Sequence, residues 1–204
     1  MNQGLAQTIR DQRRDRILQT AREVFFAEGY GAATMSMIAA RLGGSKGTLY
    51  AYFKNKEDLF DEIIRDQCSV IQSALDLAEG SDVRTTLTAF GLELMTALTS
   101  DWAVRTLQLV IEEAVRNPEL AQRFNQAGPK QGTAAIAAYL AKAHERGEIC
   151  TPDPLRAANV LGSLLKGELH FRRMLGLEPE PTPEMIVREV DTAVNVFLAA
   201  YAPK

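Results

Sequence analysis

The apolar residues of this chain recur at spacings of three and four, which is the period of an α-helix that buries one face. The clearest early set consists of Ile17, Leu18, Ala21, Val24 and Phe25. Strict alternation of apolar and polar residues, the pattern of a half-buried strand, does not extend over a convincing length anywhere. The sequence therefore predicts an all-α fold.

Glycine and proline residues divide this pattern into separate helices. Gly29 ends the first helix, and the pair Gly43-Gly44 ends a short second helix that starts near Thr34. A third short helix is predicted over residues 45–53. Longer helices are predicted over residues 56–78, 83–99, 101–116, 118–146, 154–175 and 184–201, with a kink or a fresh start at Pro129.

The net charge of -3 conceals an uneven distribution. Residues 1–56 carry nine Lys and Arg against four Asp and Glu, a net charge of +5, whereas residues 57–204 carry -8. A basic segment attached to an acidic one indicates that the first segment meets a polyanion, although a chance fluctuation in surface charge gives the same count. We therefore expect two domains, 1–56 and 57–204, of which only the first binds nucleic acid.

Composition and motifs exclude several other classes of protein. The chain is 46% hydrophobic and 24% charged, and no run approaches the roughly 20 apolar residues of a membrane span. The polar N-terminus does not resemble a secretory signal, and Cys68 and Cys150 lack zinc-like spacing, so we expect reduced thiols in a cytoplasmic protein. No nucleophile with a positioned base and no phosphate-binding glycine loop is evident, so we expect neither an enzyme nor a cofactor or metal.

Residues 34–53 have the pattern of two short helices joined by a turn that contains glycine. A helix that enters a major groove needs small residues in its first turn and polar side chains that reach bases and phosphates. In the segment capped by Ser45, Leu49 would hold the helix on a core, and Gly47 removes a side chain where the approach is closest. Lys56 begins the next helix, whose free N–H groups also favour a phosphate.

Two segments resemble the DNA-binding signature of the TetR family: 29–39, GYGAATMSMIA, and 43–59, GGSKGTLYAYFKNKEDL. The match extends over about residues 15–60 without a gap. Two residues depart from the pattern, because Ala33 stands where the family usually has threonine and Gly44 where it usually has valine. The resemblance implies an N-terminal three-helix domain with a helix-turn-helix, followed by a larger helical bundle. It also implies a homodimer in which a small molecule controls binding to a palindromic operator in double-stranded DNA.

The resemblance further implies which residues contact DNA. Residues of the second helix would touch a phosphate or a base edge, and those of the third helix would lie in the major groove. Tyr50 would contact a thymine methyl or the backbone, and Tyr52 and Lys56 would contact phosphates, unless the tyrosines are ordinary half-buried aromatics. The full expected set is Thr34, Ser36, Ser45, Lys46, Gly47, Thr48, Tyr50, Tyr52 and Lys56.

Among the four arginines that precede the first apolar stripe, three lie at positions 10, 13 and 14. They have the composition of an N-terminal arm that contacts the backbone or the minor groove of DNA. A solubilising tail has the same composition, so the sequence leaves both interpretations open.

Two stripes near the C-terminus have the spacing of a helix-bundle seam. In proteins of the TetR family the last two helices of each subunit build a four-helix dimer interface. The alternative is that a stripe packs only within its own subunit, because periodicity does not say whose surface it meets. The expected interface residues are Leu161, Leu165, Leu169, Val187, Val190, Val194, Phe197 and Tyr201.

The middle of the chain resembles, less specifically, the AefR-like branch of the same family, on the residues Asp101-Trp102, Asn117-Pro118-Glu119-Leu120 and Gly128-Pro129. Large side chains there would line a cavity for a largely apolar effector, or would simply form core, since pockets and cores use the same residue types. The candidates are Phe90, Leu94, Met95, Trp102, Leu107, Val110, Phe124, Tyr139 and His170.

Two functions remain in competition. The leading one is a ligand-responsive repressor that binds its operator as a dimer and has no membrane partner. The alternative is a helical ligand-carrier or interaction module that does not bind an operator. Operator binding weakens steeply with salt and prefers one palindrome over scrambled DNA, so a salt titration separates the two.

Overall fold

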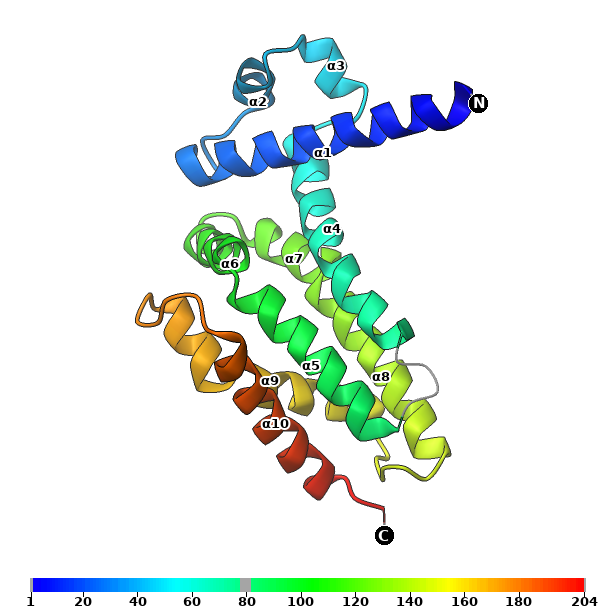
Figure 1. Cartoon of the computed structure of the whole chain (residues 1–204). Coiled ribbons are helices and arrows are strands. Elements are labelled where there is room, and N and C mark those ends of the chain that lie inside the picture. Colours follow the sequence, from blue (N-terminus) through cyan, green and yellow to red (C-terminus); the bar gives the residue numbers. More distant parts are fainter. Residues whose placement is uncertain (1, 78–81, 204) are drawn as a thin grey trace. The chain divides into compact units, whose positions relative to one another are not determined.

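The computed structural model describes residues 2–77 and 82–203 of the 204-residue chain. Within these ranges every regular element is an α-helix, which confirms the all-α prediction (Figure 1). The helices are α1 (Asn2–Glu28), α2 (Met35–Leu42), α3 (Lys46–Tyr50), α4 (Lys56–Leu77), α5 (Val83–Thr99), α6 (Asp101–Ala114), α7 (Pro118–Ala127), α8 (Pro129–Glu145), α9 (Pro154–Met174) and α10 (Pro183–Ala200).

The helix ends follow from local chemistry. Side-chain oxygens accept the backbone N–H three residues ahead at the starts of α2, α3, α5, α9 and α10, which satisfies donors that a helix leaves unpaired. Proline occupies the first turn of α8, α9 and α10, where its missing N–H has no cost. Gly43 ends α2 with φ of 69°, a conformation that favours glycine. A new helix, α8, begins at Pro129, which agrees with the sequence prediction.

Backbone contacts divide the chain into two compact units. The first contains Met1–Asp66 and Leu109–Ala127, and the second contains Gln67–Gln108 and Gly128–Lys204. The continuous part of the first unit thus extends ten residues beyond the domain boundary expected at residue 56. It includes the first half of α4, and the end of α6 together with α7 also belongs to it.

The core of the first unit is built around the buried face of α1. The stripe that its spacing predicts is at most 3% exposed, and it ends beside three packed aromatic rings. The ring of Tyr30 lies 5.3 Å from that of Phe25 and 5.2 Å from that of Phe60, centroid to centroid. Tilted contacts at these distances are favourable beyond the area they bury. Ile38 of α2 and Leu49 of α3 complete this core, so both short helices are attached to the longer ones by apolar side chains.

The core of the second unit lies among α5, α8, α9 and α10. Helix α5 packs closely on α9 and α10 because Gly91 has no side chain. A Cβ atom there would lie 2.8 Å from a methyl of Val190 and 3.0 Å from one of Leu165. Helix α9 is kinked at Gly167, where φ is 35° and ψ is -152°. That conformation is rarely adopted by other residues, so the glycine is required for the change of direction.

A buried arginine fastens the junction of α5 and α6 in this second unit. Arg173, in the last turn of α9, donates to the carbonyl of Thr99 at 3.0 Å and to the carboxylate of Asp101. It also reaches the carbonyl of Glu178 in the following loop, at 3.4 Å. The side chain is 10% exposed, so its charge is compensated by these partners rather than by water.

Candidate nucleic-acid interface

Helix α3 is short, and its geometry depends on its cap and on one apolar anchor. The hydroxyl oxygen of Ser45 accepts the backbone N–H of Thr48 at 3.3 Å, and the two hydroxyl oxygens lie 3.1 Å apart. Leu49 is 1% exposed and holds the helix on the core. The helix is shorter than the predicted 45–53 because it ends at Tyr50, and Phe53 reaches the core from the segment that follows.

Helix α2 is held in the same manner. The hydroxyl oxygen of Thr34 accepts the backbone N–H of Met37 at 3.3 Å, and Met35, Ile38 and Ala39 are buried. Thr34 and its neighbour Ser36 are exposed. A hydroxyl that accepts a cap bond still has an O–H to donate, so Thr34 can cap α2 and also bond a phosphate oxygen.

The side chains expected at DNA are gathered on α2, α3 and the residues that flank them. Tyr50 is 51% exposed, although it is a large aromatic residue, whereas Thr48, Tyr52 and Lys56 are half-buried. The remaining expected contacts are exposed: Thr34, Ser36, Ser45, Lys46 and Gly47. The arrangement leaves polar and aromatic groups on the outer side of two short helices whose inner side is fully packed.

The N-terminal arginines do not form an extended arm, because α1 is helical from Asn2 onward. The guanidinium carbon of Arg10 lies 6.0 Å from the ring centroid of Tyr52, at cation–π distance. Arg13 is exposed. Arg14 is engaged in ion pairs within the protein, so the three arginines lie in three different environments.

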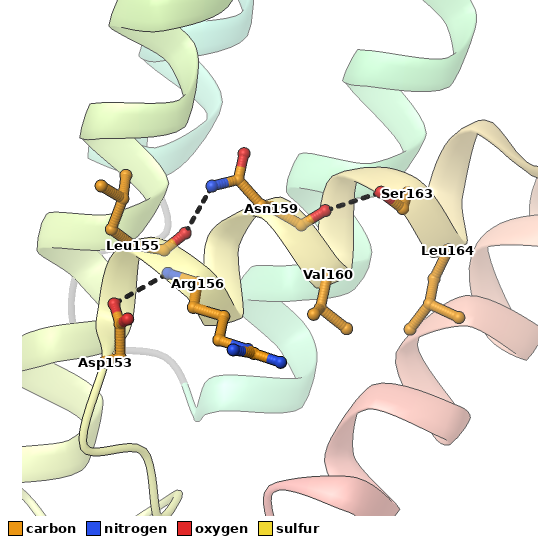
Figure 2. Close-up of a pocket in the computed structure, with 7 residues that line it drawn as sticks. All are labelled: Asp153, Leu155, Arg156, Asn159, Val160, Ser163 and Leu164. Atoms are coloured by element: carbon orange, nitrogen blue, oxygen red, sulfur yellow. Dashed lines mark hydrogen bonds between the residues drawn. The ribbon is translucent and has the colours of Figure 1, made fainter.

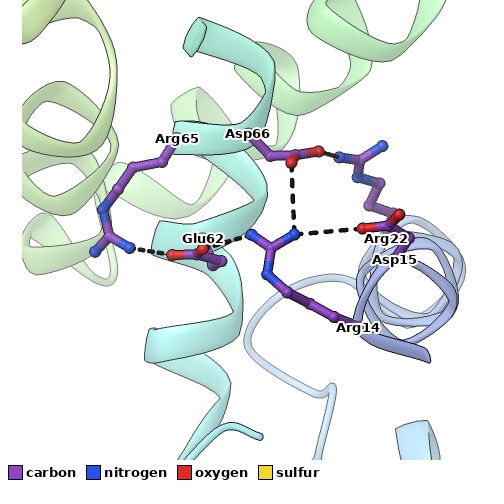
Figure 3. Close-up of polar contacts among 6 residues, drawn as sticks. All are labelled: Arg14, Asp15, Arg22, Glu62, Arg65 and Asp66. Atoms are coloured by element: carbon purple, nitrogen blue, oxygen red, sulfur yellow. Dashed lines mark hydrogen bonds and ion pairs between the residues drawn. The ribbon is translucent and has the colours of Figure 1, made fainter. Parts of the chain in front are cut away.

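The ion pairs of Arg14 belong to a network of charged side chains between α1 and α4 (Figure 3). Its guanidinium donates to Glu62 at 2.5 Å and lies 3.7 Å from Asp66, which also accepts from Arg22 at 3.2 Å. Arg65 pairs with the other oxygen of Glu62. Burial raises the pKa of the Glu62 carboxyl, but the hydrogen bond and charge of Arg14, with Arg65, outweigh it and hold the pKa below its usual range.

This network of charged side chains continues to α7. Arg123 of α7 donates to Asp61 of α4 at 3.0 Å and to Glu119 of its own helix at 3.2 Å. Because Asp61 also lies 3.8 Å from Arg65, charges of alternating sign connect α1, α4 and α7. Helix α4 is therefore held on both sides by side-chain charges within the first unit.

Lys56, expected at a phosphate, is directed into the protein. Its ammonium donates to the carbonyls of Tyr30, Gly31 and Ala33 at 2.8, 3.3 and 3.2 Å. It also lies 4.5 Å from the centroid of the Tyr30 ring. An ammonium has three N–H donors, so all of them are used by the turn between α1 and α2.

The residues expected at an effector occupy varied environments. Phe90 and Met95 are fully packed in the core of the second unit, and Val110 is buried in the first. Burial, together with the charge of Lys166, lowers the pKa of His170. The half-buried members are Leu94, Trp102, Leu107, Phe124, Tyr139 and His170.

Two open grooves lie instead along the last two helices. The groove on α9 has a volume of about 630 Å³ (Figure 2), and the groove on α10 about 480 Å³. The first is lined by Asp153, Leu155, Arg156, Asn159, Val160, Ser163 and Leu164. The second is lined by Pro183, Glu184, Val187, Arg188, Asp191, Thr192 and Asn195. Neither lining includes a residue expected at the effector.

Most of the residues expected at a dimer interface are buried within the single chain. Six of the eight are at most 6% exposed within the single chain and belong to one core: Leu161, Leu165, Leu169, Val190, Val194 and Phe197. Tyr201 is half-buried and stacks on Phe197 with 4.6 Å between ring centroids. Val187 is 43% exposed and stays available to a partner. Within the single chain, the two stripes are therefore buried mainly against each other and against the neighbouring helices.

Within the described parts of the chain, no helix has the length and apolar character needed to cross a membrane. The same residues contain no group of three or more His, Cys, Asp or Glu side chains placed to hold a metal ion.

Comparisons with known proteins agree with this geometry. A family model described as "Bacterial regulatory proteins, tetR family" matches residues 17–63, and one described as "AefR-like transcriptional repressor, C-terminal domain" matches residues 85–203. The HTH-type transcriptional regulator UidR of Escherichia coli K12 is 32% identical over 151 residues, which cover 72% of this chain and 74% of UidR.

Solved structures extend the similarity to nearly the whole chain. A putative TetR-family regulator from Mesorhizobium loti has a TM-score of 0.79 and 28% identity, and the match covers 94% of this chain and 97% of that one. The flavonoid-responsive regulator FrrA has a TM-score of 0.75 and 32% identity, with 93% and 97% covered. The chain therefore belongs to the TetR family of transcriptional regulators, with a helix-turn-helix DNA-binding domain at its N-terminus and an AefR-like domain after it.

Proposed function

We propose that this protein is a repressor that binds a palindromic operator as a homodimer and is released from it by a small, largely apolar effector. The observation that carries the proposal is the outer side of α2 and α3, where the exposed ring of Tyr50 lies on the same short helix as exposed Lys46, and the exposed Ser45 caps that helix. Exposed lysine, hydroxyl and tyrosine groups on a capped short helix are suited to phosphates and base edges. Because DNA is the target, we place the protein in the cytoplasm.

The test for an operator first selects the genomic DNA fragments that bind the protein. The affinity of the protein is then measured for the tightest-binding fragment and for a scrambled duplex of equal composition. We expect two chains per palindrome, a preference for the selected fragment, and a steep fall of affinity with salt through counterion release. Equal affinity for both duplexes would contradict the proposal and favour a carrier or interaction module.

The proposed dimer uses the outer faces of α9 and α10 rather than their buried stripes. Leu155 and Val187 are 55% and 43% exposed and lie in the two grooves, and Val196 of α10 is 50% exposed. Apolar side chains along neighbouring helices favour association with a second helix pair.

Light scattering tests this assignment. The wild type should have twice the 22.5 kDa mass of one chain. Leu155→Asp and Val187→Asp should shift it toward the monomer, whereas Val115→Asp, at an 89% exposed position in the turn after α6, should not. A Val187→Asp protein that stays fully dimeric would place the interface elsewhere.

The proposed effector class rests on the apolar character of the second unit and on one relative. FrrA is described as flavonoid-responsive, which supports trying flat aromatic compounds first. Mass spectrometry of compounds that co-purify with the native protein, and release of the selected DNA fragment by each, provide the test. An effector that binds but leaves operator affinity unchanged would contradict release.

A further inference from the structure

The turn between α1 and α2 is held by a side chain from another helix. Gly29 leaves α1 with φ of 77°, and the backbone N–H of Ala33 returns to the Gly29 carbonyl at 3.1 Å. The ammonium of Lys56, at the start of α4, bonds three carbonyls of this turn, with the shortest contact of 2.8 Å to Tyr30. Bonds from a charged donor are stronger than neutral ones, so this contact fixes the path of the chain into α2.

A carboxylate from α6 approaches the same turn. The backbone N–H of Gly31 donates to Oε1 of Glu113 at 3.4 Å. A Cβ atom at Gly31 would lie 3.2 Å from that oxygen, so the absence of a side chain gives the carboxylate its place. The N–H of Gly31 thus faces an anion from α6 while its carbonyl accepts from the cation of Lys56.

This turn ends one residue before the first expected DNA contact. Ala33, whose carbonyl accepts from Lys56 at 3.2 Å, is followed directly by the α2 cap Thr34. Helix α2 is eight residues long and packs on α1 and α3. A rotation of the chain where it enters α2 would therefore move the cap residue Thr34 and helix α3 together.

We propose that Lys56 and Glu113 are positioning residues for operator binding, which act through the Gly31 peptide and not through contact with DNA. This inference rests on the proposed operator binding. It changes the role expected for Lys56 from a phosphate contact to a residue that positions the DNA-facing side of α2 and α3. It also gives a residue of α6, 82 positions after Gly31, a part in DNA recognition.

The first experiment compares Lys56→Met with Lys46→Met, which removes an exposed lysine of α3. Loss of one phosphate contact lowers the slope of log affinity against log salt by about one on any DNA. We expect that loss for Lys46→Met only. Lys56→Met should instead lower operator affinity about tenfold or more, which corresponds to about 1.4 kcal/mol, and leave the slope on scrambled DNA unchanged. A slope reduced by about one in Lys56→Met would overturn the positioning role.

The second experiment uses the free protein, so it remains informative if no operator exists. The amide resonance of Gly31 in a ¹H–¹⁵N spectrum should shift in Lys56→Met and in Glu113→Ala, and should stay near its wild-type position in Glu112→Ala. Glu113→Gln keeps an oxygen that accepts the Gly31 N–H, so it should retain most of the resonance position and of the operator affinity.

The outcomes are distinct. If Lys56→Met unfolds the first unit, the Glu113 variants, which leave Lys56 in place, decide the question. An unmoved Gly31 resonance in Glu113→Ala, or equal operator affinity of Glu113→Ala and the wild type, overturns the inference. A shifted Gly31 resonance without any operator preference in the wild type refutes the proposed function, but it still shows that Lys56 and Glu113 hold the turn between α1 and α2.

Discussion

The guanidinium of Arg14 on α1 donates a 2.5 Å hydrogen bond to the carboxylate of Glu62 on α4. The bond joins the helix that carries the basic N-terminus to the helix that follows the DNA-binding motif. Both side chains are about 70% buried, with exposed fractions of 31% and 28%, so water screens the pair only in part.

This pair predicts how acid affects the first unit. The pKa of Glu62 in the folded protein lies below its value in the unfolded chain, about 4.3. A lowered pKa stabilises the fold above the unfolded value, and that contribution is lost as pH falls through the folded value. Glu62→Gln should therefore reduce stability at pH 7 by up to about 1 kcal/mol. Urea unfolding followed at neutral and at strongly acid pH should show this difference disappearing in acid, and a constant difference would contradict it.

Gly91 on α5 predicts an effect of packing. Alanine there would place a methyl 2.8 Å from Val190, so Gly91→Ala should destabilise the second unit by about 1–3 kcal/mol despite its better helix propensity. The matched control is Gly132→Ala on α8, where a Cβ meets nothing within 4 Å and the expected change is a gain of about 0.4–1 kcal/mol. Thermal unfolding distinguishes them, and equal stability of the two variants would mean that the α5 contact is not tight.

Ser45 allows the cap of α3 to be separated from its DNA contact. Ser45→Ala should cost about 0.5–2 kcal/mol of stability, because the Thr48 N–H loses its acceptor. Ser45→Asp keeps a capping oxygen and should restore stability, yet its negative charge on an exposed side chain should still weaken DNA binding. Unfolding and DNA titration are measured on both variants. Wild-type DNA affinity in Ser45→Asp would exclude Ser45 from the interface.

Tyr50 tests whether the ring or the hydroxyl reaches DNA. Its 51% exposure means that truncation removes little core packing. Tyr50→Ala should weaken operator binding more than Tyr50→Phe, because the ring supplies most of the expected contact with a thymine methyl or the backbone. Fluorescence anisotropy with the selected fragment measures both. Equal losses would indicate that the hydroxyl is the important group.

Much of the fold follows from signals that act within a few residues. The cap at Thr34, the left-handed Gly43 and the fresh start at Pro129 are each determined by the conformational limits of one residue and its near neighbours. For the same reason the sequence places the motif correctly on α2 and α3. The length of α3 was overestimated, since the apolar spacing of Leu49 and Phe53 continues beyond the last helical residue.

Contacts between distant residues could not be predicted in this way. Helical spacing identifies Val190 as buried, but it does not reveal that the burying surface is Gly91 and Leu165 of the same chain. The destination of the Lys56 ammonium depends on carbonyls 23 to 26 residues earlier. Glu113 gave no local sign of a role near α2, because its partner is a backbone N–H 82 residues away.

The brevity of α3 has a consequence for how such a regulator diversifies. Only Leu49 of its five residues is committed to the core, while the cap at Ser45 can be supplied by several residue types. Lys46 and Tyr50 face outward and can be exchanged without a change in the packing beneath them. Descendants of this sequence could therefore acquire a new target site by a few surface substitutions, while the packed scaffold beneath them is inherited unchanged.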